Sequence, residues 1–361
     1  MRITLGSLAL MVALAVANCG PPPEEMEDAL GREAAVSEET ASLTPWGTPL
    51  PLGLDPGVPV PSNNAMSPDK IELGRLLFFD PRLSLDGTIA CATCHVPAAG
   101  GTDNRPTSAG IGGQVGGRSA PTVVNSAYVL PHFWDGRAPT LEEQAKGPQT
   151  NPIEMGNPDL GSVAQRIGAL AGYREWFEKA FGTDEVTPDR IAQAIAAYER
   201  TILSGNSPFD RFEAGEKNAL TAQQQVGLEL FRGEALCVTC HSGPNLADNR
   251  FHNIGVGTQA PEAEVDAGRM MVTNEPKDWA AFKTPTLRVI SKTAPYMHDG
   301  SEPTLEAVVE YYDRGGTPNK NLDPLMRPLG LGSDQKQALV AFLKALDGEI
   351  LNAQPPAAFP N

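Results

Sequence analysis

The sequence predicts a mainly α-helical protein with two similar domains, and three observations support this prediction. Several stretches of the 361-residue chain place apolar residues three and four positions apart, as a helix with one buried face does. No stretch alternates convincingly between apolar and polar residues, as a half-buried strand would. One five-residue pattern occurs twice, at residues 91–95 and 237–241, and each copy follows a Gly-x-x-Leu-Phe sequence that begins at Gly74 or Gly227. The chain is long enough for two domains, each with its own core.

The repeated pattern is Cys-x-x-Cys-His. Two thiols at this spacing with a histidine after the second are typical of covalent c-type haem attachment. Each thiol adds to a haem vinyl group, and the imidazole ligates the iron. Cysteine pairs also bind zinc, but a zinc ribbon does not need a histidine directly after the second cysteine in both copies. The sequence therefore predicts two covalently bound haem c groups, one in each cytochrome c-like domain. The residues predicted to hold them are Cys91, Cys94 and His95 in the first copy and Cys237, Cys240 and His241 in the second.

The N-terminus resembles an export signal, because Arg2 is followed by a largely apolar run that ends at Ala17. We expect residues 1–18 to be removed, and two outcomes are open. Cleavage before Asn18 would release a soluble periplasmic protein, whereas a lipobox-like sequence would place a lipid on Cys19. The otherwise unpaired Cys19 thiol favours the lipid anchor. The apolar run is short for a transmembrane span, and both outcomes place the protein in the periplasm.

The rest of the chain divides by composition. Residues 19–53 are rich in proline and acidic residues, which cannot form a core, so we expect a disordered acidic tether. The first domain is predicted over residues 54–215 and the second over residues 216–361. The net charge of −16 argues against nucleic acid as a partner, and it would attract a basic electron-transfer protein.

Capping signals predict several helix starts. Ser67 precedes a proline, Thr187 precedes another, and Thr221 with Gln224 forms a capping box. Residues 98–117 are rich in glycine and predict a loop that lies close against a flat group. The expected helices cover residues 67–80, 141–145, 162–180, 188–203, 221–231, 305–312 and 334–346, with a break after the second at Pro148 and Pro152.

Several blocks resemble the bacterial di-haem cytochrome c peroxidases, over about residues 67–346. The most distinctive blocks lie at residues 121–125, 133–138, 141–145, 151–155, 284–288 and 293–300. This resemblance implies two c-type haem domains packed together, and the reduction of hydrogen peroxide to water. It also implies that peroxide reacts at the His95 haem. Electrons would arrive through the His241 haem from a small donor protein, a cytochrome c or a cupredoxin.

The resemblance also assigns roles to three residues. Glu154 matches the family's catalytic carboxylate, Gln144 its distal amide, and Trp134 the tryptophan between the haems. Peroxide cleavage needs a group that takes a proton from the near oxygen and returns it to the leaving one, which is the role implied for Glu154. Without the resemblance, Glu154 would be interpreted as a solvated loop acid, and Trp134 as a core aromatic residue.

A calcium ion between the domains is a further implication of the resemblance. The backbone oxygens of Thr293 and Pro295 match two of the family's ligands. The family's asparagine ligand falls at Ser119, and serine is the shorter and weaker oxygen donor.

Two positions depart from the pattern of many peroxidases in this family. Their histidine in the glycine-rich loop, which blocks the first haem until the second is reduced, falls at Ile111. Isoleucine cannot ligate iron, so we expect the His95 haem to have an open face in the oxidised protein. Their methionine ligand on the second haem falls at Tyr312. Both features resemble the MauG-type branch of the family.

Helical periodicity supports Tyr312 independently. The residues three, four and seven positions before Tyr312 are all apolar, so its side chain is predicted to face inward, whereas Tyr311 points about a quarter turn away. An anionic phenolate ligand would stabilise the higher oxidation states of the second haem. Tyr312 could also be a core aromatic residue, and Met326 is the alternative ligand.

The sequence leaves three hypotheses about the function of the protein. The leading hypothesis is a periplasmic di-haem peroxidase, and the alternative is a MauG-type oxidase that uses peroxide or oxygen to oxidise residues of a partner protein. A non-enzymatic electron carrier would need both irons six-coordinate, and Ile111 argues against that. The three other histidines, which we expect to form hydrogen bonds or contact haem propionates, are His132, His252 and His298.

Overall fold

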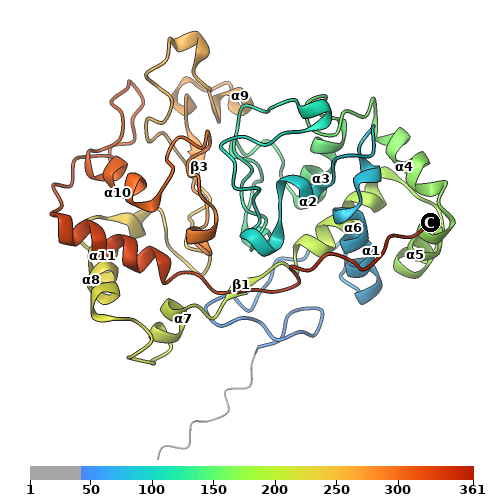
Figure 1. The fold of residues 1–361 in the computed structure, drawn as a ribbon, viewed down its shortest axis with the longest axis horizontal. Coiled ribbons are helices and arrows are strands. Elements are labelled where there is room, and N and C mark those ends of the chain that lie inside the picture. The colour runs from blue at the N-terminus through green and yellow to red at the C-terminus, as the bar shows by residue number, and fades with distance from the viewer. Residues whose placement is uncertain (1–41) are drawn as a thin grey trace, which may run out of the picture. The chain divides into compact units, whose positions relative to one another are not determined.

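The computed structural model describes residues 42–361, which form one compact unit with mainly helical secondary structure (Figure 1). The predicted export signal, Cys19 and most of the predicted tether lie outside the described residues. No helix of the described part is both long enough and apolar enough to cross a membrane. The mainly α-helical class is therefore confirmed, whereas the division into two domains at residue 215 remains a prediction.

The helices before the second haem motif divide between two cores: α1 and α3 to α6 bury their inner faces in the first, whereas α7 packs against the second. Ser67 caps α1 by accepting a hydrogen bond from the amide of Lys70, and Thr187 caps α6 in the same way. The helices are α1 (Pro68–Phe79), α2 (Cys91–Cys94), α3 (Leu141–Thr150), α4 (Leu160–Gly168), α5 (Ala171–Phe181), α6 (Pro188–Glu199) and α7 (Pro208–Glu213).

A second hydrophobic core lies around the later helices, mainly α8, α10 and α11. Thr221 and Gln224 form the predicted capping box of α8. The helices are α8 (Ala222–Arg232), α9 (Met270–Thr273), α10 (Leu305–Asp313) and α11 (Ser333–Lys344).

The two Gly-x-x-Leu-Phe sequences make the same contact in the two cores. A Cβ atom on Gly74 of α1 would lie 1.8 Å from the carbonyl oxygen of Ala194 in α6. A Cβ atom on Gly227 of α8 would lie 2.0 Å from the carbonyl oxygen of Ala338 in α11. Each glycine therefore permits the close crossing of a helix pair next to a haem motif, which agrees with one module used twice.

The strands are short. β1 (Ser204–Gly205) pairs antiparallel with β4 (Glu349–Ile350), with Ser204 opposite Ile350. β2 (Phe251–His252) pairs antiparallel with β3 (Phe282–Lys283), with Phe251 opposite Lys283. Strands of two residues are too short to show an alternating pattern, which explains why none was predicted.

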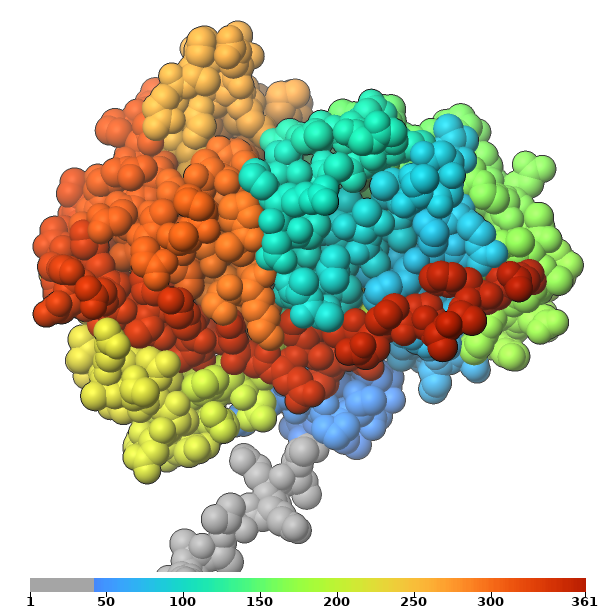
Figure 2. All heavy atoms as spheres, viewed as in Figure 1, coloured from blue at the N-terminus to red at the C-terminus, as the bar shows by residue number. Residues whose placement is uncertain are grey.

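The C-terminal segment ties the second core back to the first helices. After β4, the amide of Leu351 donates to the carbonyl of Leu203, and the amide of Gly172 donates to the carbonyl of Asn361 at 2.6 Å. Figure 2 shows this segment as a band across the surface. The C-terminus therefore lies against α5, a helix of the first core.

Three segments differ from the prediction. Residues 162–180 form α4 and α5 rather than one helix, because Leu170 is extended. Pro148 lies inside α3, which continues to Thr150 with Gln149 buried on its inner face. Residues 42–53 were predicted to belong to the disordered tether, but the Leu52 carbonyl accepts a hydrogen bond from the amide of Asn206 at 2.7 Å. The composition of a segment does not reveal hydrogen bonds to residues that are far away in the sequence.

Candidate functional site

The first haem motif forms α2 and the residue after it. The Thr93 hydroxyl accepts a hydrogen bond from the amide of Ala90, and the amide of His95 donates to the carbonyl of Cys91, both at 2.9 Å. Nδ1 of His95 lies 3.3 Å from the carbonyl oxygen of Gly101, so it carries the proton. Burial lowers the pKa of His95, which keeps the ring neutral. Nε2 is therefore left with the lone pair that an iron ligand needs.

The second haem motif repeats this arrangement on a 3₁₀ turn over Cys237–Thr239. The amide of His241 donates to the carbonyl of Cys237 at 2.9 Å. Nδ1 of His241 lies 3.1 Å from the carbonyl oxygen of Leu246, and burial lowers the pKa of this ring as well. Both histidines therefore have the tautomer and the second contact that are typical of iron-ligating imidazoles.

The four thiols fit haem attachment better than a zinc site. All four are free of disulfides, and each lies within the turn that carries its histidine. Within residues 42–361, one group of three potential metal ligands comes together, namely Cys240, Asp248 and His252. This group contains neither Cys237 nor His241, and His252 is hydrogen-bonded to both Asp248 and Asp323. The residues present therefore fit two thioether-linked haems.

Ile111 lies directly against the segment that carries Glu154. The amide of Ile111 donates to the carbonyl of Glu154 at 2.9 Å, and a Cβ atom on Gly110 would lie 2.0 Å from the carbonyl oxygen of Ile153. The Ile111 side chain packs on the first core. Only a glycine at position 110 allows this approach, so the glycine-rich loop is pressed against the turn after α3.

Glu154 is a half-buried carboxyl with one oxygen fixed. The side-chain amide of Asn151 donates to its Oε1 at 2.7 Å, and Oε2 makes no hydrogen bond to the described residues. Burial raises the pKa of Glu154, whereas the charge of Arg137 and the bond from Asn151 act in the opposite direction. A carboxyl with one free oxygen can take up and return a proton, and its raised pKa makes the protonated form easier to reach than for an exposed glutamate.

Gln144 and Trp134 lie on the elements that flank Glu154. Gln144 is half-buried on α3, and its side-chain amide has no partner among the described residues. Trp134 donates from Nε1 to the carbonyl of Ser119 at 2.9 Å, and its own carbonyl accepts from the amide of Lys283 at 2.8 Å. Trp134 therefore contacts segments that precede and follow the second haem motif in sequence. The structure records no direct contact between Gln144 and Glu154.

The two tyrosines of α10 have different surroundings. Tyr311 is 3% exposed, and its hydroxyl donates to the carbonyl of Ile254 at 2.9 Å. Burial, and then the charges of the Cys237 and Cys240 thiolates, raise the pKa of Tyr312. Tyr311 is thus the buried member of the pair and Tyr312 is half-buried, so the prediction that Tyr312 faces inward while Tyr311 points away is wrong for Tyr311.

Met326 lies in the loop between α10 and α11. Its Cε atom would lie 2.9 Å from a Cβ atom on Gly316, and its amide donates to the carbonyl of Asp323 at 2.9 Å. These contacts are those of a loop-packing residue. Tyr312 remains the predicted ligand of the second haem, and Met326 the alternative.

The predicted calcium ligands lie on two segments that a hydrogen bond joins. The amide of Ser119 donates to the carbonyl of His298 at 2.7 Å. The side-chain amide of Asn104 caps the carbonyls of Lys292 and Ala294 at 2.7 and 3.0 Å. The intervening carbonyl of Thr293 and the following one of Pro295 make no hydrogen bond to residues 42–361. These two free oxygens fit a cation, and calcium itself remains a prediction.

The other histidines are buried or half-buried in separate places. His252 is held between two carboxylates, as expected for a hydrogen-bonding residue. His298 stacks on Phe282 with ring centroids 3.6 Å apart. Nε2 of His132 is buried and has no partner in the described part of the chain. The carbonyls of Gly101 and Leu246, and the amide of Asn151, were not predicted, because only the folded chain brings them to the histidines and to Glu154.

Comparisons with known proteins agree with this site. The family model described as di-haem cytochrome c peroxidase matches residues 68–218. Cytochrome c551 peroxidase of Nitrosomonas europaea is 43% identical over 82% of this chain and 85% of that protein. Methylamine utilization protein MauG of Methylophilus methylotrophus is 38% identical over 89% of this chain and 96% of that protein. Among solved structures, a MauG-like protein associated with microbial copper homeostasis matches with a TM-score of 0.75 and 35% identity, over 80% of this chain and 92% of that one.

Proposed function

Because the chain belongs to the di-haem cytochrome c peroxidase family, we propose that it reduces hydrogen peroxide to water in the periplasm. Membership of this family makes the chain an enzyme, so the hypothesis of a non-enzymatic carrier is wrong. The family implies two c-type haems, which we assign to His95 and His241. The observation that carries the proposal is the contact of Ile111 with Glu154, because it puts a residue that cannot ligate iron beside the acid–base group.

The protein's part of the reaction is proton transfer and positioning. A haem held by Cys91, Cys94 and His95 would supply the iron chemistry that activates peroxide. Oε2 of Glu154 would take the proton from one peroxide oxygen and return it to the other as that oxygen leaves, while Asn151 holds Oε1 in place. Gln144, on the preceding helix, is assigned to orient the peroxide. With two electrons and two further protons, one peroxide gives two molecules of water.

Electron delivery is assigned to the His241 haem and to Trp134. The hydrogen bonds of Trp134 to Ser119 and Lys283 fix its ring and its backbone, which supports the relay role that the family's pattern implies for this residue. A small donor protein, a cytochrome c or a cupredoxin, would reduce the second haem. The chain's net charge of −16 favours a donor with a basic surface.

The alternative is a MauG-type oxidase that oxidises residues of a partner protein. Tyr312 favours this alternative, because an anionic phenolate on the second haem would stabilise its higher oxidation states. This ligation rests on the family's pattern, in which the position of the methionine ligand falls at Tyr312. We further propose that calcium binds at Ser119, Thr293 and Pro295, and that Cys19 carries a lipid.

Steady-state assays distinguish the two functions. The full-length, haem-loaded protein is mixed with hydrogen peroxide and reduced cytochrome c or a reduced cupredoxin. A peroxidase oxidises two equivalents of donor for each peroxide consumed. Peroxide consumption without donor oxidation, together with oxidised residues on a partner protein, would favour the alternative. If the fully loaded protein consumed no peroxide, the peroxidase would be excluded, and oxidised residues on the partner protein in the presence of oxygen would then be required to support the alternative.

A further inference from the structure

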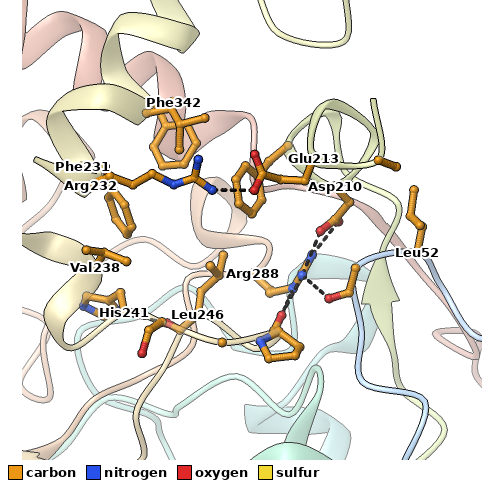
Figure 3. Close-up of a pocket in the computed structure, with 17 residues that line it drawn as sticks. Leu52, Asp210, Glu213, Phe231, Arg232, Val238, His241, Leu246, Arg288 and Phe342 are labelled. Carbon is orange, nitrogen blue, oxygen red and sulfur yellow. Dashed lines mark hydrogen bonds and ion pairs between the residues drawn. The ribbon is translucent and has the colours of Figure 1, made fainter. Parts of the chain in front are cut away.

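Arg288 joins three distant segments of the chain behind the second haem motif (Figure 3). The residue is 2% exposed. Its Nε and Nη2 atoms donate to the carbonyl of Pro244 at 2.8 and 2.7 Å, and Nη2 also donates to the carbonyl of Gly53 at 2.9 Å. Nη1 and Nη2 bind the carboxylate of Asp210 at 2.6 and 2.9 Å. This two-point ion pair fixes the plane of the guanidinium and so fixes its remaining donors.

The Pro244 carbonyl belongs to the loop that orients His241. Two residues later, the carbonyl of Leu246 accepts the hydrogen bond from Nδ1 of His241 at 3.1 Å. Between them, the carbonyl of Asn245 accepts from the Thr286 hydroxyl at 2.7 Å. The amide of Arg288 donates in turn to the same hydroxyl at 3.1 Å. Thr286 and Arg288 therefore donate hydrogen bonds to two successive carbonyls of the loop, those of Asn245 and Pro244.

The loop is anchored in the second core by Leu246, and its His241 side borders a cavity that Arg288 also lines. A cavity of about 390 Å³ lies there, and Figure 3 shows His241 and Leu246 on its wall together with Arg288. Cys237, Cys240 and Tyr312 do not line this cavity, so it is not the space between His241 and Tyr312. Packing holds Leu246, and the hydrogen bonds from Arg288 and Thr286 hold the two carbonyls that precede it, those of Pro244 and Asn245.

We propose that the Asp210–Arg288 pair is a positioning device for His241 and thereby sets the reduction potential of the second haem. The proposal rests on the proposed function, because it takes His241 as the ligand of that haem. A firm bond from Nδ1 to Leu246 makes the imidazole a stronger donor to iron and stabilises the ferric state. A looser loop weakens this bond, so the potential of the second haem rises. The paired charges of Asp210 and Arg288 cancel, which leaves position as the main effect of the pair.

The test uses Arg288→Lys in the full-length, haem-loaded protein. Lysine keeps the positive charge but lacks the planar fork, so it cannot hold Asp210 and Pro244 together. Spectroelectrochemical titration measures both haems in one sample. We expect the ferric–ferrous equilibrium of the second haem to shift about tenfold towards ferrous, about 59 mV for a one-electron couple. The potential of the His95 haem should not change.

Two further variants separate position from charge and from misfolding. The neutral double variant Asp210→Asn with Arg288→Met should raise the potential in the same direction, which a purely electrostatic effect would not do. Thr286→Val, a neutral change, removes the hydroxyl that bonds Asn245 and the amide of Arg288 but keeps the Arg288 guanidinium. It should give a smaller rise, and it covers the case in which the Arg288 variants lose the second haem. The matched control is Arg232→Lys, because Arg232 pairs with Glu213 at 2.5 Å on the same cavity but does not contact the loop.

Unchanged potentials of the second haem in the Arg288→Lys and Thr286→Val variants, with two haems bound, would overturn the proposal. Equal shifts in the Arg232→Lys control would also overturn it. A wild-type protein that binds only one haem would instead refute the proposed function. Haem content by the pyridine haemochrome method distinguishes these failures.

Discussion

The amide of Ile111 donates a hydrogen bond to the carbonyl of Glu154 at 2.9 Å. The residue at the position of the family's blocking histidine therefore contacts the segment that carries the proposed acid–base group. The same backbone contact would remain with any side chain at position 111. The chemical difference between an open and a blocked haem thus depends on one side chain, on a loop whose path Gly110 fixes.

Replacement of Glu154 by glutamine removes the proposed proton acceptor and keeps the side chain's size. We expect the rate of peroxide reduction to fall by about 10²–10⁴-fold, the usual contribution of a general acid–base group. Haem content should not change. Glu143→Gln is the control, because Glu143 is exposed on α3 and pairs only with Lys146. Equal rates for wild type and Glu154→Gln would remove Glu154 from the mechanism.

The pH dependence of the rate should respond to Arg137. Glu154 must be ionised to accept a proton, so the rate falls as pH falls through its pKa, which burial raises. The positive charge of Arg137 lowers the pKa of Glu154, so Arg137→Met should raise it further and move the acid limb of the profile to higher pH. Arg137→Lys keeps the charge and should leave the limb in place. A shift to lower pH in Arg137→Met would contradict this account.

The adjacent tyrosines of α10 provide a matched pair of variants. Tyr312→Phe removes the proposed phenolate ligand, so the absorption spectrum of the second haem should change and its potential should rise. Tyr311→Phe leaves the buried carbonyl of Ile254 without its donor, which should lower the free energy of unfolding by about 1–3 kcal/mol. Its haem spectrum should stay like that of the wild type. Optical redox titration and chemical denaturation measure the two effects. If the Tyr312→Phe variant kept the wild-type haem spectrum, Tyr312 would not be the ligand, and Met326 would become the candidate ligand of the second haem.

Local signals predicted most helix starts. Ser67, Thr187, Thr221 and Thr304 each cap a helix by accepting a hydrogen bond from a backbone amide within three residues, and all four helices were expected. The break between α4 and α5 and the two-residue strands were missed. They depend on tertiary packing or on pairing partners far along the chain, which periodicity does not register.

In the site, too, the sequence predicted features that depend on neighbouring residues and missed those that depend on distant ones. The Cys-x-x-Cys-His motifs are local in sequence, so the attachment residues could be named at once. The contacts of Arg288 could not, because Gly53 and Asp210 lie 235 and 78 residues away along the chain. The order within residues 42–53 was missed for the same reason. The roles of Glu154, Gln144, Trp134 and Tyr312 rest on the family's pattern and on their surroundings, and they remain predictions.

The most direct test of the central claim is rapid mixing of the oxidised, haem-loaded protein with hydrogen peroxide, followed through the haem absorption spectrum. We predict a fast spectral change without prior reduction, because Ile111 leaves the His95 haem open. Ile111→His should abolish this change until the protein is reduced, whereas Ile153→His, in the adjoining turn, should not. If the oxidised wild-type protein failed to react with peroxide, the His95 haem would be closed and the role given to Ile111 would be wrong.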